Sequence, residues 1–232
     1  MLKKVTGKNL SMDGLGIQGI FFPEQIFFGH KEAPEKELDI PLDTMGLQEY
    51  LLVIKPCSEV YNKISEEKEN FYSHYKEKAV VKTKPYITIA NFLAKESMEE
   101  TMIRWIQRIC SRQRSFVVTL NNYSGFPPHT IFLRVQDPEP FKILARELKT
   151  IDEYIRSNGC PKAYLVNRPH LTIARRLPES VYEKAMLDYS QKLFCESFLV
   201  GELELMRRSG PFEKCKVINV FGLLPQENKL IN

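Results

Sequence analysis

The sequence has no uninterrupted apolar run close to the roughly 20 residues that a membrane-spanning helix needs. The best candidate, residues 15–28, is interrupted by Gln18, Pro23, Glu24 and Gln25. The basic start, Met1-Leu-Lys-Lys, is followed by polar and glycine-containing sequence instead of the compact apolar core of a signal peptide. We therefore expect a cytoplasmic protein with no membrane segment.

Paired cysteines are also missing. The five cysteines, at positions 57, 110, 160, 195 and 215, are odd in number and include no C-x-x-C pair. This pattern argues against a zinc ribbon or a disulfide framework and suits a reducing compartment. We expect most of them to be buried free thiols.

A large charge excess of either sign is absent as well. The chain has 33 Lys and Arg against 29 Asp and Glu, for a net charge of +4. A mildly basic protein can bind a phosphate or a nucleic acid, but the composition is equally that of a solvated surface.

Residues 1–46 differ from the rest and are predicted to be an N-terminal extension, followed by one domain at 47–227. The extension holds six of the eleven glycines and four phenylalanines between positions 21 and 28. Its G-x-G-x-x-G pattern at positions 14, 16 and 19 is attributed to chance, because no strand precedes it and no helix follows it. A docking surface for a partner protein on this extension is one hypothesis for its role.

From residue 49 onward the hydrophobic pattern becomes regular and predicts an α+β fold. The helices are expected at 58–78, at 97–112 behind a capping box at Ser97–Glu100, at 138–157 and at 178–194. The strands are expected at 49–55, 84–92, 115–120, 129–135, 169–174, 198–206 and 215–223, the last two as an antiparallel hairpin.

Two of these strands are copies of one motif. Residues 84–90 (Lys-Pro-Tyr-Ile-Thr-Ile-Ala) align with residues 168–174 (Arg-Pro-His-Leu-Thr-Ile-Ala). Side chains alternate along a strand, so His170 shares a face with Thr172, and Tyr86 with Thr88. If the two strands meet, four polar side chains surround one ligand. The repeat thus predicts two related halves and a site between them.

The chemistry that suits two His-x-Thr units is phosphoryl transfer at a sugar hydroxyl. One imidazole takes a proton from the attacking oxygen and a second donates one to the leaving oxygen, because imidazole titrates near neutrality. Threonine hydroxyls hydrogen-bond the non-bridging phosphate oxygens, where negative charge must be held. This scheme requires no metal and no cofactor.

Two H-x-[ST] motifs of this kind, each after a proline, resemble those of the two-histidine (2H) phosphoesterases. That family includes the 2′-5′ RNA ligase-like enzymes and the 2′,3′-cyclic nucleotide phosphodiesterases. The resemblance spans about residues 47–225 and implies a bilobed α+β fold, with two pseudo-symmetric halves whose antiparallel sheets line a central cleft and helices outside. It implies that His170, Thr172 and Thr88 act on RNA or on a small nucleotide with a phosphodiester or cyclic phosphate.

Tyr86 stands where the family has its first histidine. A phenol, with an ordinary pKa of about 10, is a poor general base at neutral pH, although it can donate a proton or a hydrogen bond. The sequence therefore leaves two functions open: a phosphodiesterase or RNA ligase-like enzyme, or a nucleotide- or RNA-binding module with impaired turnover. It does not predict the oligomeric state.

Three further residues are candidate substrate-binding groups. Arg176 follows His170 and Thr172 at even spacing and is expected to share their face and meet a phosphate. Phe132 is a candidate to stack on a base, although core packing is the alternative. His129, at the start of a neighbouring strand, is a candidate cleft residue, with a loop-edge position as its alternative.

Overall fold

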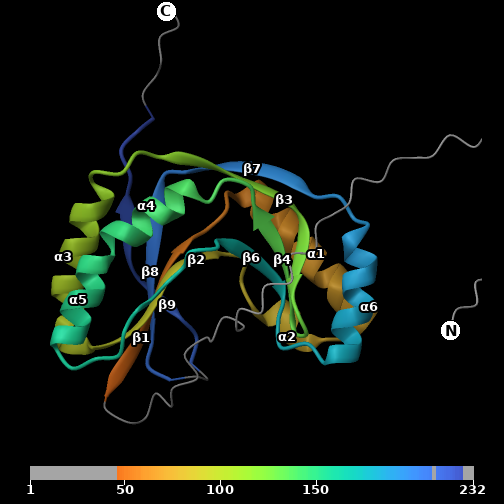
Figure 1. The fold of residues 1–232 in the computed structure, drawn as a ribbon, viewed down its shortest axis with the longest axis horizontal. Helices are drawn as coiled ribbons and strands as arrows, with labels where there is room; N and C mark the ends of the chain where they lie inside the picture. The colour runs from red at the N-terminus through yellow and green to blue at the C-terminus, as the bar shows by residue number, and fades with distance from the viewer. Residues whose placement is uncertain (1–45, 211–212, 227–232) are drawn as a thin grey trace, which may run out of the picture. The chain divides into compact units, whose positions relative to one another are not determined.

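The computed structural model describes residues 46–210 and 213–226 (Figure 1). The strands are β1 (Leu47–Ile54), β2 (Ile87–Lys95), β3 (Phe116–Phe126), β4 (Thr130–Val135), β5 (Tyr164–Leu165), β6 (His170–Ala174), β7 (Cys195–Val200), β8 (Glu202–Arg208) and β9 (Lys216–Gly222). The α-helices are α1 (Ser58–Tyr75), α2 (Lys78–Lys82), α3 (Glu99–Cys110), α4 (Glu139–Glu147), α5 (Lys149–Ser157) and α6 (Glu179–Ser190). Across these two ranges, no helix is long and apolar enough to cross a membrane.

The strands form one curled antiparallel sheet in the order β7-β3-β4-β6-β2-β1-β8-β9, with β5 beside β2 (Figure 1). The two halves of the sheet meet where β2 pairs with β6, at Ile87 and Leu171. The strands that carry the repeated motif are therefore neighbours at the centre of the sheet, and the predicted α+β class is confirmed.

One face of the sheet carries the main hydrophobic core. Alternate strand residues such as Leu52, Ile87 and Leu171 are fully buried there, and all six α-helices contribute apolar side chains to the same cluster. On the opposite face, Leu51, Val53 and Met206 form a smaller cluster, against which Tyr86 and Cys215 pack. The alternation along β1 separates the two faces, because neighbouring residues of a strand point in opposite directions.

In each half of the sheet, one helix crosses over and packs against the strands of the other half. α1 follows β1 but packs against β6 and β7, whereas α4 follows β4 but packs against β2. α3 follows β2 and contacts β9, and α6 follows β6 and contacts β3 and β4. Figure 1 accordingly shows α3, α4 and α5 together on one side and α1, α2 and α6 on the other. This arrangement confirms the two related halves that the repeat predicts.

Three expected elements differ in the structure. The expected helix 138–157 is divided at Leu148, whose backbone N–H bonds Leu144 and whose carbonyl accepts from Ile151 in a tighter turn. The capping box at Ser97 is wrong, because that residue lies in a 3-10 turn, η2 (Glu96–Met98), and Met98 is the N-cap of α3. The expected strand 198–206 is broken at Gly201, because β7 pairs with β3 while β8 pairs with β1.

All five cysteines are free thiols, as the pattern predicts, but only Cys110 and Cys160 are buried. Burial raises the pKa of the Cys110 thiol to about 12, so this residue stays protonated and unreactive. The predicted extension and its glycine motif lie outside the described residues, apart from Gly46, so the domain boundary stays a prediction.

Candidate active site

The repeated motif places four polar side chains on the face of the sheet opposite the main core. Ile87 and Leu171 pair directly, and both are fully buried in that core. Their strand neighbours, Tyr86 and Thr88 on one side and His170 and Thr172 on the other, therefore point to the opposite face. All four side chains are half-buried, as expected for groups that line an accessible site. The predicted grouping is thus present in the structure.

Each copy of the motif contains a β-bulge at the same position. Leu52 pairs with Ala90 but Val53 with Thr88, which leaves one extra residue, Ile89, in β2. In β6, Phe132 pairs with Thr172 but Ile131 with Ala174, which leaves Ile173 as the extra residue. In both copies the isoleucine and the following alanine are buried. The bulge reverses the alternation after the threonine.

This reversal corrects the expected position of Arg176. Ala174 is 1% exposed and packs in the main core, so the shared face expected for residues 170, 172, 174 and 176 ends at Thr172. Arg176 is exposed and has a left-handed backbone with φ of 57°. A phosphate-binding role for Arg176 stays a prediction.

The charge of Arg175 reaches the face that carries Tyr86. Burial raises the pKa of the Cys215 thiol, and the positive charges of Arg208 and Arg175 lower it in part. Cys215 packs with Tyr86 against Leu51, Val53 and Met206. The same charge also lowers the pKa of Lys68 in α1.

The His170 ring is oriented by its backbone and by two phenylalanines. Its Nδ1 donates to the carbonyl of Arg168 at 3.0 Å, so in the neutral ring Nε2 is the basic nitrogen. Phe126 and Phe132 lie 5.2 and 4.9 Å from the ring, centroid to centroid, and stack on each other at 4.4 Å. These contacts restrict the imidazole to one orientation.

The structure therefore gives Phe132 a packing contact with the imidazole. It is 8% exposed, so most of its surface is already covered, and stacking on a base stays a prediction for this residue. Phe126 is more exposed and lies beside the same imidazole, which makes it the better candidate for such a contact.

His129 lies in the turn between β3 and β4. Its Nδ1 donates to the carbonyl of Leu177 at 2.9 Å, and the Leu177 N–H donates back to the His129 carbonyl at 3.0 Å. These bonds connect the turn to the segment between β6 and α6. These two hydrogen bonds give His129 a structural role, and its substrate-binding role stays a prediction.

Two hydrogen-bonded polar residues that the sequence did not predict as part of the site lie on the same face as Tyr86. Glu49 and Asn91 are 5% and 6% exposed, and Asn91 Nδ2 donates to Glu49 Oε1 at 3.0 Å. Arg208 forms an ion pair with the same carboxylate. The bulge at Ile89 puts Asn91 here, because strict alternation assigns it to the other face. In the sequence, Glu49 is identified only as the first residue of an expected buried strand, at 49–55, and not as a site residue.

No three His, Cys, Asp or Glu side chains of the described ranges gather into a group that could hold a metal ion. The imidazole of His170 lies on β6, and the phenol of Tyr86 directly precedes the adjoining strand β2. This arrangement can move protons and hold a phosphate through hydroxyls and a guanidinium.

A family model described as the 2′-5′ RNA ligase superfamily matches residues 59–211. The chain belongs to this superfamily. Its fold is similar to that of E. coli LigT complexed with 3′-AMP, with a TM-score of 0.54 and 17% identity over 76% of this chain and 98% of that one. The protein TT0787 of Thermus thermophilus is similar at a TM-score of 0.53 and 17% identity, over 77% of this chain and 100% of that one.

At 17% identity, the likeness to these two structures shows the fold, and this is the 2H phosphoesterase fold that the motif implied. No curated protein sequence matches the chain. Superfamily membership agrees with the site, because the pairing of β2 with β6 brings the two motif copies together.

Lys68 of α1 holds the segment that leads into the first motif. It is 3% exposed, and its ammonium donates to the Thr83 hydroxyl at 2.7 Å, the Thr83 carbonyl at 3.1 Å and the Val80 carbonyl at 3.3 Å. Burial, with a smaller contribution from Arg175, lowers the pKa of Lys68 to about 8. Its hydrogen bonds fix the chain three residues before Tyr86.

This lowered pKa predicts a pH dependence of stability. In the unfolded chain a lysine titrates near pH 10.4, so between pH 8 and about 10.4 the unfolded state binds more protons. The free energy of unfolding should therefore rise with pH in this window, by up to about 1.4 kcal/mol per unit, relative to Lys68→Met. Urea denaturation at three pH values tests this, with exposed Lys184→Met as the control. If the difference in the free energy of unfolding between wild type and Lys68→Met does not change with pH, the lowered pKa of Lys68 is contradicted.

Proposed function

We propose that this protein is a phosphodiesterase that opens 2′,3′-cyclic phosphates, or processes 2′-5′-linked RNA or nucleotides, by acid–base catalysis without a required metal. The observation that carries the proposal is the pairing of the two motif copies, which puts His170, Thr172, Thr88 and Tyr86 on one face. The similar LigT structure holds 3′-AMP, which supports a nucleotide ligand here.

In the proposed reaction, His170 is the base. Its Nε2 accepts a proton from water as the water oxygen forms a bond to phosphorus. The bond from phosphorus to one ribose oxygen breaks, and the Tyr86 hydroxyl protonates that oxygen as it leaves. The proton on His170 then restores the phenol, directly or through water. A phenol is suited to the acid role because it is protonated at neutral pH.

Two hydroxyls and one guanidinium stabilise the phosphate in this scheme. Thr88 and Thr172 flank the paired residues Ile87 and Leu171, so their hydroxyls reach a ligand from both strands. They donate to the non-bridging oxygens, where negative charge increases in the transition state. In this scheme Arg175, which directly follows β6, supplies a positive charge to the phosphate. Removing one such donor typically lowers the rate by roughly 100- to 1,000-fold.

A second function is supported by Tyr86 itself. A protein that has the cleft but lacks the second imidazole would bind the same nucleotides with little turnover. The two functions share every contact with the ligand and differ only in whether Tyr86 transfers a proton.

The test is a panel of 2′,3′-cyclic nucleotides and 2′-5′-linked dinucleotides, incubated with wild type, Thr172→Val and the control Thr150→Val. Thr150 lies on α5, and its hydroxyl donates to the Glu147 carbonyl. We expect turnover of at least one substrate class by wild type and by Thr150→Val, and a loss of roughly 100-fold in Thr172→Val. Binding without turnover supports the binding module, and neither binding nor turnover rejects both functions.

A further inference from the structure

The face of the sheet that carries the motif side chains also holds an amide whose hydrogen bonding is incomplete. The Nδ2 of Asn91 donates to Glu49, but its carbonyl oxygen Oδ1 is buried and accepts no hydrogen bond from the described part of the chain. Leaving a buried acceptor without a donor is unfavourable, and most such atoms in proteins have a partner. An unpaired acceptor beside a candidate active site is therefore a group that a ligand can satisfy.

Glu49 determines which way the amide of Asn91 points. Because a carboxylate accepts hydrogen bonds, Glu49 holds the NH₂ group of Asn91 and turns Oδ1 away from itself. Arg208 forms an ion pair with the same carboxylate, so Glu49 is itself held in place. Glu49 pairs with Leu93, two residues beyond Asn91 along β2, so Oδ1 is turned toward the end of β2 that carries Thr88.

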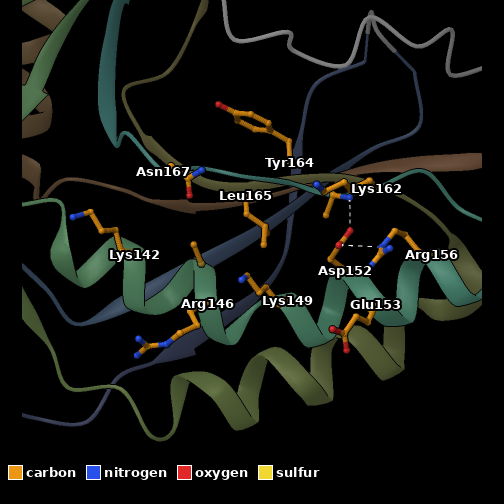
Figure 2. A pocket seen from close by; sticks show the side chains of 12 residues that line it. Lys142, Arg146, Lys149, Asp152, Glu153, Arg156, Lys162, Tyr164, Leu165 and Asn167 are labelled. Carbon is orange, nitrogen blue, oxygen red and sulfur yellow. Dashed lines mark hydrogen bonds and ion pairs between the residues drawn. The ribbon is translucent and has the colours of Figure 1, made fainter. Parts of the chain in front are cut away.

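The neighbours of Asn91 on this face are aromatic and apolar. Asn91 pairs with Tyr164 of β5 on one side and with Leu51 of β1 on the other, and directly paired residues share a face. Figure 2 shows the Tyr164 ring pointing away from the side chains of α4 and α5, on the opposite side of β5 from Leu165. Leu51 belongs to the apolar cluster against which Tyr86 packs. The unpaired acceptor thus lies between an aromatic ring and an apolar surface.

The separation between Asn91 and the phosphate-binding hydroxyls suits one nucleotide. Asn91 follows Thr88 by three residues, which at about 3.3 Å per residue is at most roughly 10 Å, because the bulge at Ile89 shortens the path. A nucleotide whose phosphate lies between Thr88 and Thr172 can extend its base over this distance. A flat base fits beside the Tyr164 ring, since bases stack on aromatic side chains.

We propose that Asn91 is a specificity-determining residue that selects nucleotides whose base has an amino group on its pairing edge, cytosine or adenine, over uracil and guanine. This inference rests on the proposed function and names the class of base that the same site prefers. The amino group of cytosine or adenine donates to Oδ1 of Asn91. Uracil and guanine have a carbonyl oxygen at the equivalent position, which would leave two acceptors facing each other without a donor.

The test compares the binding of cytidine 3′-monophosphate with that of uridine 3′-monophosphate, which differ only at the pairing edge of the base. Isothermal titration calorimetry gives both dissociation constants for wild type, Asn91→Leu, Glu49→Gln and the control Asn62→Leu. Asn62 is an exposed residue of α1, and thermal melting confirms that each variant is folded. The preference is the ratio of the two dissociation constants, so a general loss of affinity in a variant does not change it.

We expect wild type and Asn62→Leu to bind the cytidine nucleotide about tenfold more tightly, because only its base pairs the buried acceptor. Asn91→Leu should lose this preference. Glu49→Gln should reduce it, because a glutamine can hold the amide of Asn91 in either orientation. Equal affinities in wild type, or a preference that persists in Asn91→Leu, overturn the proposal.

The outcome is separable from that of the proposed function, because neither nucleotide contains a phosphodiester and its binding requires no turnover. A base preference in a protein that hydrolyses no cyclic substrate rejects the proposed catalysis only. Turnover by a wild type that lacks the preference rejects the role of Asn91 only. Binding of neither nucleotide, with no turnover, rejects both.

Discussion

Replacing His170 by alanine should lower kcat for 2′,3′-cyclic phosphate hydrolysis by about 100- to 10,000-fold, the usual contribution of one general acid–base group. The imidazole is the group of the site that takes the proton of the attacking water in our scheme. Its Nδ1 donates to the Arg168 carbonyl, which leaves Nε2 as the nitrogen that can accept this proton. Thr88 and Thr172 remain in the variant, so binding of substrate should decrease much less than kcat.

The alanine variant also loses the contacts of the imidazole with Phe126 and Phe132, at a cost of about 1 kcal/mol each. His170→Gln separates this loss from the chemistry, because glutamine fills similar space but does not titrate. The matched control is His74→Ala, an exposed histidine of α1 that hydrogen-bonds the Asn70 carbonyl and lies 6.3 Å from the Tyr75 ring, centroid to centroid. Retained turnover in both His170 variants would refute the catalytic assignment, whatever their melting temperatures.

Replacing Tyr86 by histidine should raise kcat by roughly tenfold or more. A general acid works best when its pKa lies near the working pH, and an imidazole meets this condition better than a phenol does. The new imidazole directly precedes β2, which pairs with the strand that carries His170, so both proton transfers take place across the same phosphate. Initial rates on the substrate turned over by wild type measure the gain.

Tyr86→Phe is the control for this gain. It keeps the ring that packs against Leu51, Val53 and Met206, but it removes the hydroxyl. If the phenol is the acid, Tyr86→Phe should lose activity by about 100-fold. Equal rates in wild type and Tyr86→Phe would exclude the acid role. A silent wild type with an active Tyr86→His would instead identify the natural protein as a binding module in a competent cleft.

The grouping of the four motif side chains was predictable because it follows from the local geometry of a strand. Strand residues alternate with period two whatever surrounds them, so one repeated heptapeptide placed Tyr86 with Thr88 and His170 with Thr172. The repeat also predicted that the two strands belong to related halves, which the pairing of Ile87 with Leu171 and the exchanged helices confirm.

The remaining residues of the site depend on partner strands. The bulges at Ile89 and Ile173 exist only relative to β1 and β4. They decide that Asn91 points to the face of the site residues and that Ala174 packs in the core. The last strands divide at Gly201 because β7 pairs with β3 while β8 pairs with β1. The long helix divides at Leu148, and its two parts have different neighbours, since α4 packs against β2 and α5 against α3.

By itself, the sequence determined the α+β class, the duplicated motif and the side chains able to move a proton or hold a phosphate. Those features follow from local periodicity and from residue chemistry. Only the tertiary structure decided that the face shared by His170 and Thr172 ends before Ala174, and that Phe126 and Phe132 orient the imidazole. These features arise from strand register and from contacts between distant segments, which no single stretch of sequence encodes.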